Sequence, residues 1–212
     1  MVFNKNHFKG ALSISLIGPL FEESLLKTHK IFHDIIFVDG GANFQSLFNA
    51  QTSLSIGDND SCKTKLDVTF PKEKDESDLS LALNYVPDSC KSLHLYGFLG
   101  GRSDHELGVL GELHSKLLNS QSIKVIYSYH TKKKWILIND EDFFLTIFGE
   151  FSIFTLYKQN ISISGEAKYT GDEITLTPLS TRGLSNIGSG EINIKSSHPL
   201  LIIQDDFEKL NL

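Results

Sequence analysis

The feature of this sequence that most restricts its fold is a change of pattern near residue 128. Before that point, short apolar runs alternate with segments whose apolar residues recur at helical spacing. Beyond it, nearly every segment is short, often β-branched, and bounded by Gly, Asn or charged residues. Alternating strands and helices indicate a mostly parallel sheet with helices on both faces. The chain is therefore predicted to be an α/β protein, with an α/β domain at residues 1–130 followed by an all-β sandwich domain at residues 131–212.

The periodicity also predicts where the elements lie. In the first domain, strands are expected at residues 11–18, 34–41, 53–61, 67–70, 92–98 and 122–128. Helices are expected there at residues 20–33, 42–50, 76–86 and 104–119. In the second domain, strands are expected at residues 134–139, 143–149, 151–157, 160–165, 173–179, 191–196 and 199–204.

The composition excludes several classes of partner. The chain has 212 residues, 40% of them hydrophobic, which is enough to build a core. Its net charge is -6 and it has no dense Lys/Arg block, so neither nucleic acid nor an anionic membrane is expected as a partner. No leader pattern or membrane-spanning apolar run is recognised. With Cys62 and Cys90 expected to be reduced thiols, a cytoplasmic location is predicted.

The stretch SLSIGDNDSCK, residues 53–63, begins as a half-buried strand and continues into two closely spaced acids. Gly57 is expected to permit a sharp turn, beyond which Asp58 and Asp60 emerge together. Because their like charges repel, a cation is expected nearby. A solvated turn is the alternative interpretation, since Asp, Asn and Gly are common turn residues.

Other acidic blocks follow other expected strands. In a parallel sheet the ligand crevice lies beyond the carboxyl ends of the strands. Asp39 lies in VDGGAN, Asp75 and Asp78 lie in KDESD, and Arg102 and Asp104 follow LYGFLGG. Carboxylates that converge on one crevice would repel one another without a hard cation, and oxygen ligands without His or Cys suit Mg²⁺. The sequence therefore predicts a magnesium site at this edge of the sheet.

Magnesium in turn indicates a nucleotide phosphate. The glycines would let backbone N–H groups approach a polyphosphate, and Arg102 could bind it with its planar guanidinium. There is neither a GxxxxGK[ST] pattern nor a GxGxxG pattern after the first strand, so a Walker-type kinase and a dinucleotide cofactor are not expected. Structural alternatives stay open for two blocks. VDGGAN is compatible with a tight turn, and Asp78 with the first turn of a helix capped by Ser77.

The ordered blocks DGGAN, GDNDS, KDESD and GFLGGRSDH resemble those of the thiamin pyrophosphokinase family. In the second domain, GEAKY at residues 165–169 and GLSNIGSG at residues 183–190 look like segments that contribute to the thiamin site of that family, although both are also typical of hairpin turns. Asn59 stands where the family usually has an aromatic residue, and Ser77 where it usually has Thr. Both departures leave the carboxylates in place.

The resemblance implies a homodimer with its sites between subunits. It also implies transfer of the diphosphoryl group of ATP to the hydroxyl of thiamin, giving thiamin diphosphate and AMP. By the same resemblance, the metal ligands would be Asp58, Asp60 and Asp78, and the catalytic set would be these three with Arg102 and Asp104. Contacts to ATP would come from Asp39, Gly40, Gly41, Asn43, Gly100, Gly101 and Arg102, and contacts to thiamin from Tyr169, Ser185 and Asn186. A related Mg²⁺-dependent diphosphokinase for another alcohol, such as a pterin, and a binding protein without turnover are the alternatives.

Overall fold

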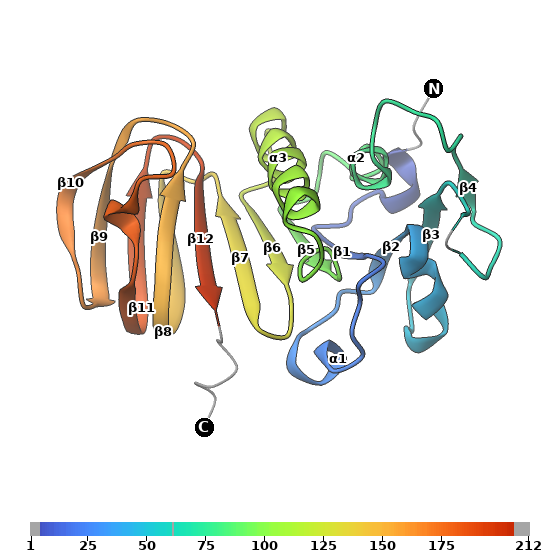
Figure 1. Cartoon of the computed structure of the whole chain (residues 1–212), viewed down its shortest axis with the longest axis horizontal. Coiled ribbons are helices and arrows are strands. Elements are labelled where there is room, and N and C mark those ends of the chain that lie inside the picture. Colours follow the sequence, from blue (N-terminus) through green and yellow to red (C-terminus); the bar gives the residue numbers. More distant parts are fainter. Residues whose placement is uncertain (1–4, 61, 206–212) are drawn as a thin grey trace. The chain divides into compact units, whose positions relative to one another are not determined.

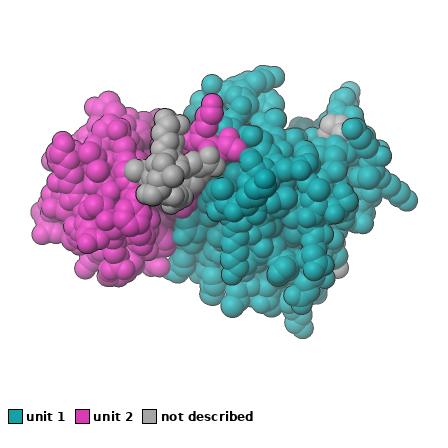
Figure 2. Space-filling view, turned by 90° about the horizontal axis from the view of Figure 1, so that it is seen from below, with its two compact units in different colours: residues 1–130 teal, residues 131–212 magenta. Residues whose placement is uncertain are grey.

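The computed structural model describes residues 5–60 and 62–205 (Figure 1). The chain divides into two compact units, residues 1–130 and residues 131–212 (Figure 2). The first unit is a mixed α/β structure and the second is built of strands. Among the described residues, no helix is both long enough and apolar enough to cross a membrane.

The first unit is organised around a parallel sheet. Its strand order is β6-β5-β1-β2-β3-β4, and every neighbouring pair is parallel. The central strands are buried along almost their whole length, as expected for a sheet that is covered on both faces. The strands are β1 (Ser13–Ile17), β2 (Asp34–Val38), β3 (Thr52–Gly57), β4 (Val68–Thr69), β5 (Ser92–Tyr96) and β6 (Val125–Tyr129).

Helices cover both faces of this sheet. On one face, Phe37 of β2 packs in a core cluster with Leu25 of α1 (Leu25–Thr28) and Ala42 of the 3-10 helix η2 (Asp39–Leu47). Because side chains alternate along a strand, Ile36 lies on the opposite face. The helix α2 (Asp78–Leu83) packs against β2 and β3, and α3 (Ser103–Asn119) packs against α2 and β6. A short 3-10 helix, η1 (Lys5–Phe8), precedes the sheet.

Two of the predicted helices differ from the structure. The helix expected at residues 20–33 is reduced to the four residues of α1, with Leu25 as its one buried residue. His29 is already extended, and the backbone N–H of Phe32 donates to Ser15 Oγ at 2.9 Å, which holds the chain in line with the sheet. The α-helix expected at residues 42–50 is instead η2, which begins directly at the end of β2. A side chain at Gly41 would lie 2.1 Å from the carbonyl oxygen of Ile17, so glycine allows η2 to approach the backbone of β1.

The second unit is antiparallel throughout. Its strand order is β10-β9-β11-β8-β12-β7. Two strands were expected at residues 143–149 and 151–157, but β8 runs continuously through both. The first ten residues of β8 pair with β11, and its last four residues pair with β12. One long strand therefore has a different partner strand at each end. The strands are β7 (Lys133–Ile138), β8 (Asp142–Thr155), β9 (Gln159–Ala167), β10 (Gly171–Leu176), β11 (Asn186–Ser196) and β12 (Leu200–Asp205), and a 3-10 helix, η3 (Thr181–Gly183), lies before β11.

Candidate active site

Three carboxylates meet at the carboxyl ends of neighbouring strands. Asp39 follows β2, and Asp58 and Asp60 follow β3, which pairs with β2 in parallel. Each offers one oxygen, and these oxygens lie within 4.8 Å of one another. The parallel pairing explains the convergence, because it brings the ends of both strands to one edge of the sheet.

The turn after β3 directs its two acids into this cluster. Asn59 adopts a positive φ of 64°, and the backbone N–H of Asp60 donates to Asp58 Oδ1 at 3.1 Å. Gly57, predicted to permit the turn, is the last residue of the strand. A side chain at Gly57 would lie 3.0 Å from the Cα atom of Asp39, so glycine allows the backbone at the end of β2 to come close. The turn itself is made by Asn59, whose φ is positive. Ser61, which ends the GDNDS block, lies outside the described residues.

Asp39 adopts a conformation that is uncommon for its residue type. Its φ is 51°, in the left-handed region, which costs a non-glycine residue on the order of 1 kcal/mol or more. The conformation arises where β2 turns directly into η2. Backbone strain of this kind concentrates at functional sites, which agrees with the place of Asp39 in the carboxylate cluster.

Asp78 begins α2 and faces the same cluster. The cap of the helix is Ser77, whose Oγ accepts the backbone N–H of Ser80 at 3.1 Å, so the carboxylate of Asp78 is not needed as the cap. Burial raises the pKa of Asp78, and the negative charges of Asp39 and Asp58 raise it further, while Lys74 lowers it. Asp78 therefore lies close enough to Asp39 and Asp58 for their negative charges to act on it.

Two lysines next to these carboxylates were not singled out in the sequence. Lys74 Nζ lies 3.4 Å from Asp78 Oδ1 and 3.7 Å from Asp58 Oδ2. Lys72 Nζ lies 2.8 Å from Asp60 Oδ2, where the Lys72 side chain is exposed. The signal was present in the run KEKD, residues 72–75, because alternating charges before an acidic helix start suggest cations near its carboxylates.

A cleft of about 690 Å³ opens beside the cluster, and its volume is within the range of small-molecule sites. Asp39, Asp78, Gly101 and Arg102 contribute to its lining. Residues of the cleft that were not predicted include Leu20, Phe98, Glu106 and Glu112. The cleft therefore combines acidic, basic and apolar surface in one place.

Two of the predicted phosphate-binding groups, Arg102 in the cleft and the backbone of Gly100 near it, have partners within the protein. Arg102 pairs with Asp104 through both ends of its guanidinium, with Nε to Oδ1 at 3.1 Å and Nη2 to Oδ2 at 2.6 Å. This pairing lowers the pKa of Asp104 to about 2. The backbone N–H of Gly100 donates to Glu106 Oε1 at 2.5 Å. A polyphosphate that bound these donors would replace the carboxylates of Asp104 and Glu106 as their partners.

The remaining predicted contacts to ATP lie around η2. Gly40 and Gly41 are buried at its start. Asn43 Oδ1 accepts the backbone N–H of Lys63 at 2.8 Å, which ties η2 to the loop after Asp60. Their roles in binding ATP stay predictions.

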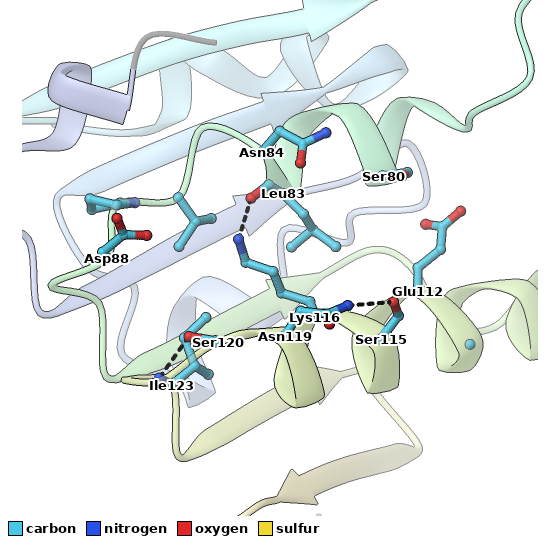
Figure 3. A pocket seen from close by; sticks show the side chains of 13 residues that line it. Ser80, Leu83, Asn84, Asp88, Glu112, Ser115, Lys116, Asn119, Ser120 and Ile123 are labelled. Atoms are coloured by element: carbon cyan, nitrogen blue, oxygen red, sulfur yellow. Dashed lines mark hydrogen bonds between the residues drawn. The ribbon is translucent and has the colours of Figure 1, made fainter.

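A second cavity, of about 430 Å³, lies between α2 and α3. Figure 3 shows Lys116 reaching across to α2, where its Nζ donates to the carbonyl oxygen of Leu83 at 2.7 Å. The carboxylate cluster is not part of the lining of this cavity, whereas Asp39 and Asp78 line the larger cleft. We therefore place the candidate active site in the larger cleft.

The residues predicted to contact thiamin lie together in the second unit. Asn186 Oδ1 accepts the backbone N–H of Tyr169 at 2.9 Å, and Asn186 Nδ2 donates to the carbonyl oxygen of Tyr169 at 2.8 Å. The Ser185 hydroxyl donates to Glu150 Oε1 at 2.7 Å, and Ser185 has a positive φ of 56°. Tyr169 and Asn186 line a cavity of about 80 Å³, far smaller than the roughly 300 Å³ at the lower end of ligand pockets. In the structure the Asn186 amide holds the Tyr169 loop, and the roles of the three residues in substrate binding stay predictions.

The arrangement defines a class of protein. A parallel sheet whose strand ends carry clustered carboxylates, beside a cleft with an arginine and glycine turns, is suited to a divalent cation and the phosphates of a nucleotide. Such a site is typical of phosphoryl-transfer enzymes, in which positioning and charge neutralisation provide most of the catalysis.

The sequence model described as "Thiamin pyrophosphokinase, catalytic domain" matches residues 25–127. This span contains every carboxylate of the cluster, Asp78 and Arg102. Residues 25–127 are thus similar to the catalytic domain of the thiamin pyrophosphokinase family, and the resemblance drawn from the ordered blocks is confirmed.

Solved structures agree with this assignment at the level of the fold. A thiamine pyrophosphokinase from Bacillus subtilis aligns with a TM-score of 0.73 and 20% identity, covering 91% of this chain and 98% of its own. A thiamin pyrophosphokinase from Geobacillus thermodenitrificans has a TM-score of 0.70 and 20% identity, with 91% and 97% covered. Thiamin pyrophosphokinase from Candida albicans has a TM-score of 0.71 and 13% identity, with 96% and 92% covered. No curated protein sequence matches the chain.

Proposed function

We propose that this protein is a thiamin diphosphokinase, which transfers the diphosphoryl group of ATP to the primary hydroxyl of thiamin. The observation that carries the proposal is the cluster of Asp39, Asp58 and Asp60 beside the cleft, within the segment that matches the family's catalytic domain. The related diphosphokinase for another alcohol is not favoured, because the solved structures that align along almost the whole chain include several described as thiamin pyrophosphokinases.

The carboxylate cluster fits a magnesium site. Mg²⁺ prefers oxygen ligands, and Asp39, Asp58 and Asp60 present three carboxylates with their oxygens within 4.8 Å of one another. We place Asp78 at the same site, since its carboxylate shares Lys74 with Asp58. Bound there, Mg²⁺ would offset the negative charge of the polyphosphate.

The residues of the cleft would position ATP for attack at its β-phosphorus. The hydroxyl oxygen of thiamin forms a bond to the β-phosphorus, and the bond from that phosphorus to the α–β bridging oxygen breaks. AMP leaves with the bridging oxygen, and the hydroxyl proton passes to solvent or a base. Arg102 lines the cleft and has a guanidinium that can bind phosphate oxygens in pairs, and in the structure this guanidinium is paired with Asp104, which the phosphates would replace. The glycine turn at Gly100 and Gly101 leaves room for a bent polyphosphate.

We infer that the second unit is a β-sandwich that contributes to the thiamin site. The division of β8 between two partner strands supports this, because one strand can contribute to both layers of a sandwich. Tyr169, Ser185 and Asn186 are proposed as thiamin contacts. The 80 Å³ cavity that Tyr169 and Asn186 line is too small to enclose an organic substrate. Further surface must therefore complete that site.

We propose that a second copy of the chain supplies this surface, as a homodimer. The apolar segment HPLLIIQ, residues 198–204, is not available for this role, because β12 is paired on both edges and Leu200, Leu201 and Ile202 are buried. Exposed apolar side chains lie instead on one face of β8 and β11, where Phe144 is 60% and Phe148 is 52% exposed. A cytoplasmic location is also proposed, because the reaction uses ATP and both cysteines are free thiols.

Product identification tests the function. The purified protein is incubated with ATP, Mg²⁺ and thiamin, and the nucleotides and thiamin species are separated by chromatography. Equimolar AMP and thiamin diphosphate are expected, with no free pyrophosphate. ADP with thiamin monophosphate would contradict the proposal in favour of an ordinary kinase. Consumption of ATP that depends on a pterin alcohol and not on thiamin would favour the other diphosphokinase.

A further inference from the structure

Lys72 and Lys74 lie beside the carboxylate cluster but contact it in different ways. Lys72 is 74% exposed and forms a surface ion pair with Asp60 at 2.8 Å. Lys74 is 15% exposed, and its Nζ lies between Asp58 and Asp78, which are 12% and 19% exposed. Only Lys74, of these two, is an enclosed cation among candidate metal ligands.

The contacts of Lys74 are long for an ion pair. Its Nζ lies 3.7 Å from Asp58 Oδ2 and 3.4 Å from Asp78 Oδ1. Strong charge-assisted N–H···O bonds are about 2.7–2.9 Å long. The ammonium is thus attracted by both carboxylates without forming a short bond to either, so a ligand that binds these oxygens directly can displace it.

A positive charge at this place offsets a real repulsion. Asp39 and Asp58 both act on Asp78 as like charges, and Lys74 acts on it in the opposite direction. A bound Mg²⁺ would also offset the repulsion among these carboxylates, and its usual distance to oxygen ligands, about 2.0–2.1 Å, is much shorter than the contacts of Lys74. An ammonium and a divalent cation that neutralise the same carboxylates repel each other, and the repulsion is stronger where solvent is excluded.

We propose that Lys74 is a built-in counter-ion of the metal site, which competes with the divalent cation for Asp58 and Asp78 and contacts the nucleotide's polyphosphate once it is displaced. Lys74 is four residues before Asp78, on the segment that leads into α2, so the displaced ammonium stays next to the cleft. Linkage then makes metal and polyphosphate bind cooperatively, because each favours the arrangement in which Lys74 has left the carboxylates. The inference deepens the proposed function and rests on it for the nature of the anion.

The first test measures the binding of Mn²⁺ alone, by electron paramagnetic resonance, with no nucleotide and no thiamin. In Lys74→Met, Mn²⁺ is expected to bind on the order of tenfold more tightly than in the wild type, because the competing charge is gone. The matched control is Lys72→Met, which removes the same charge from an exposed pair and should change the affinity by less than about threefold. Lys74→Arg keeps the charge and should resemble the wild type.

The second test measures the binding of a non-hydrolysable ATP analogue at saturating Mn²⁺, by calorimetry. Lys74→Met should bind it on the order of tenfold more weakly, while Lys72→Met and Lys74→Arg should bind it nearly as the wild type does. A merely structural role for Lys74 would not strengthen metal binding and weaken nucleotide binding in the same variant. Lys74→Gln, which is polar and uncharged, replaces Lys74→Met if that variant does not fold.

Unchanged or weaker Mn²⁺ binding in the uncharged Lys74 variants would overturn the competition. Unchanged binding of the analogue would overturn the contact with the polyphosphate. Thiamin is absent from both binding measurements. An absence of thiamin turnover would therefore contradict the proposed function without changing the result expected for Lys74.

Discussion

At the scale of single residues, the site is organised by opposite charges that are already paired. Asp58 is largely enclosed and shares Lys74 with Asp78, whereas Asp60 is 44% exposed and pairs with Lys72. The two acids of the GDNDS block therefore occupy different environments, although they are two residues apart. Asp58 is the less exposed of the two and shares its lysine with Asp78, so its replacement is the more direct test of the metal site.

Asp58→Asn should abolish most of the activity while leaving the fold intact. The change removes one charge but almost no volume, and loss of a comparable electrostatic group costs on the order of a hundredfold in turnover or more. Steady-state rates across a range of Mg²⁺ concentrations measure the effect, and circular dichroism checks the fold. Glu23→Gln, which removes a carboxylate from an exposed position, is the control and should be active. Near-normal turnover of Asp58→Asn at limiting Mg²⁺ would contradict the assignment.

At the scale of elements, the position of Asp78 depends on how α2 is held. The Ser77 hydroxyl donates to Glu112 Oε1 of α3 at 2.6 Å and accepts the backbone N–H of Ser80 at 3.1 Å. One side chain thus caps α2 and ties its first turn to the longest helix of the unit. Since Ser77 directly precedes Asp78, this link orients the carboxylate that begins the helix.

Ser77→Ala should lower the free energy of unfolding by about 1 kcal/mol, the usual cost of losing a helix cap. Ser77→Thr keeps the hydroxyl and should be close to the wild type. Urea unfolding followed by circular dichroism measures both variants. Equal stability of Ser77→Ala and the wild type would show that the cap contributes nothing to α2.

Glu112→Gln should change how stability depends on pH. Burial raises the pKa of Glu112, the negative charge of Glu76 raises it further, and the hydrogen bond from Ser77 lowers it. Because the folded pKa lies above the unfolded value, the contribution of Glu112 is fully present below the unfolded pKa and is lost as the pH rises through the folded pKa. The amide introduced by the substitution would stay neutral and could still accept the bond from Ser77.

The variant should therefore match the wild type below about pH 4 and become the more stable of the two toward neutral pH. Chemical unfolding at a series of pH values measures the difference. Parallel stability curves for the two proteins would show that ionisation of Glu112 does not affect the fold.

At the scale of the whole molecule, the two units have different kinds of exposed surface. The first unit carries the acidic cluster and the cleft. The second presents Phe144 and Phe148 of β8 and Ile187 of β11 among polar neighbours on one exposed sheet face. Clustered exposed aromatic and aliphatic side chains are typical of protein interfaces. This surface is the place where the proposed homodimer can be tested.

Phe148→Lys should weaken the dimer, because a charge would be placed in an interface that buries at least on the order of a thousand square ångströms. Light scattering at low micromolar concentration is expected to give a dimer for the wild type and a smaller mass for the variant. Asp172→Lys, at an exposed position of β10, is the control and should stay dimeric. An active wild-type monomer at that concentration would contradict the proposal.

The sequence by itself determined where the strands of the first unit occur along the chain and where the acidic blocks lie among them. Periodicity is a local property, so the alternation that predicted β1, β2, β3 and β5 could be recognised without any partner strand. The convergence of Asp39 with Asp58 and Asp60 followed from the general geometry of parallel sheets, and the four ordered blocks were specific enough to indicate the family.

Tertiary structure decided what depends on contacts distant in the sequence. The helix at residues 20–33 is shortened to α1 because the chain after it is held to the sheet by Ser15. The close approach of Gly57 to Asp39 depends on how β2 and β3 pair, which no local pattern records. The place of Lys74 between Asp58 and Asp78 likewise depends on the tertiary structure. Asp58 follows β3 and Asp78 begins α2, and these two elements meet only when α2 packs against the sheet.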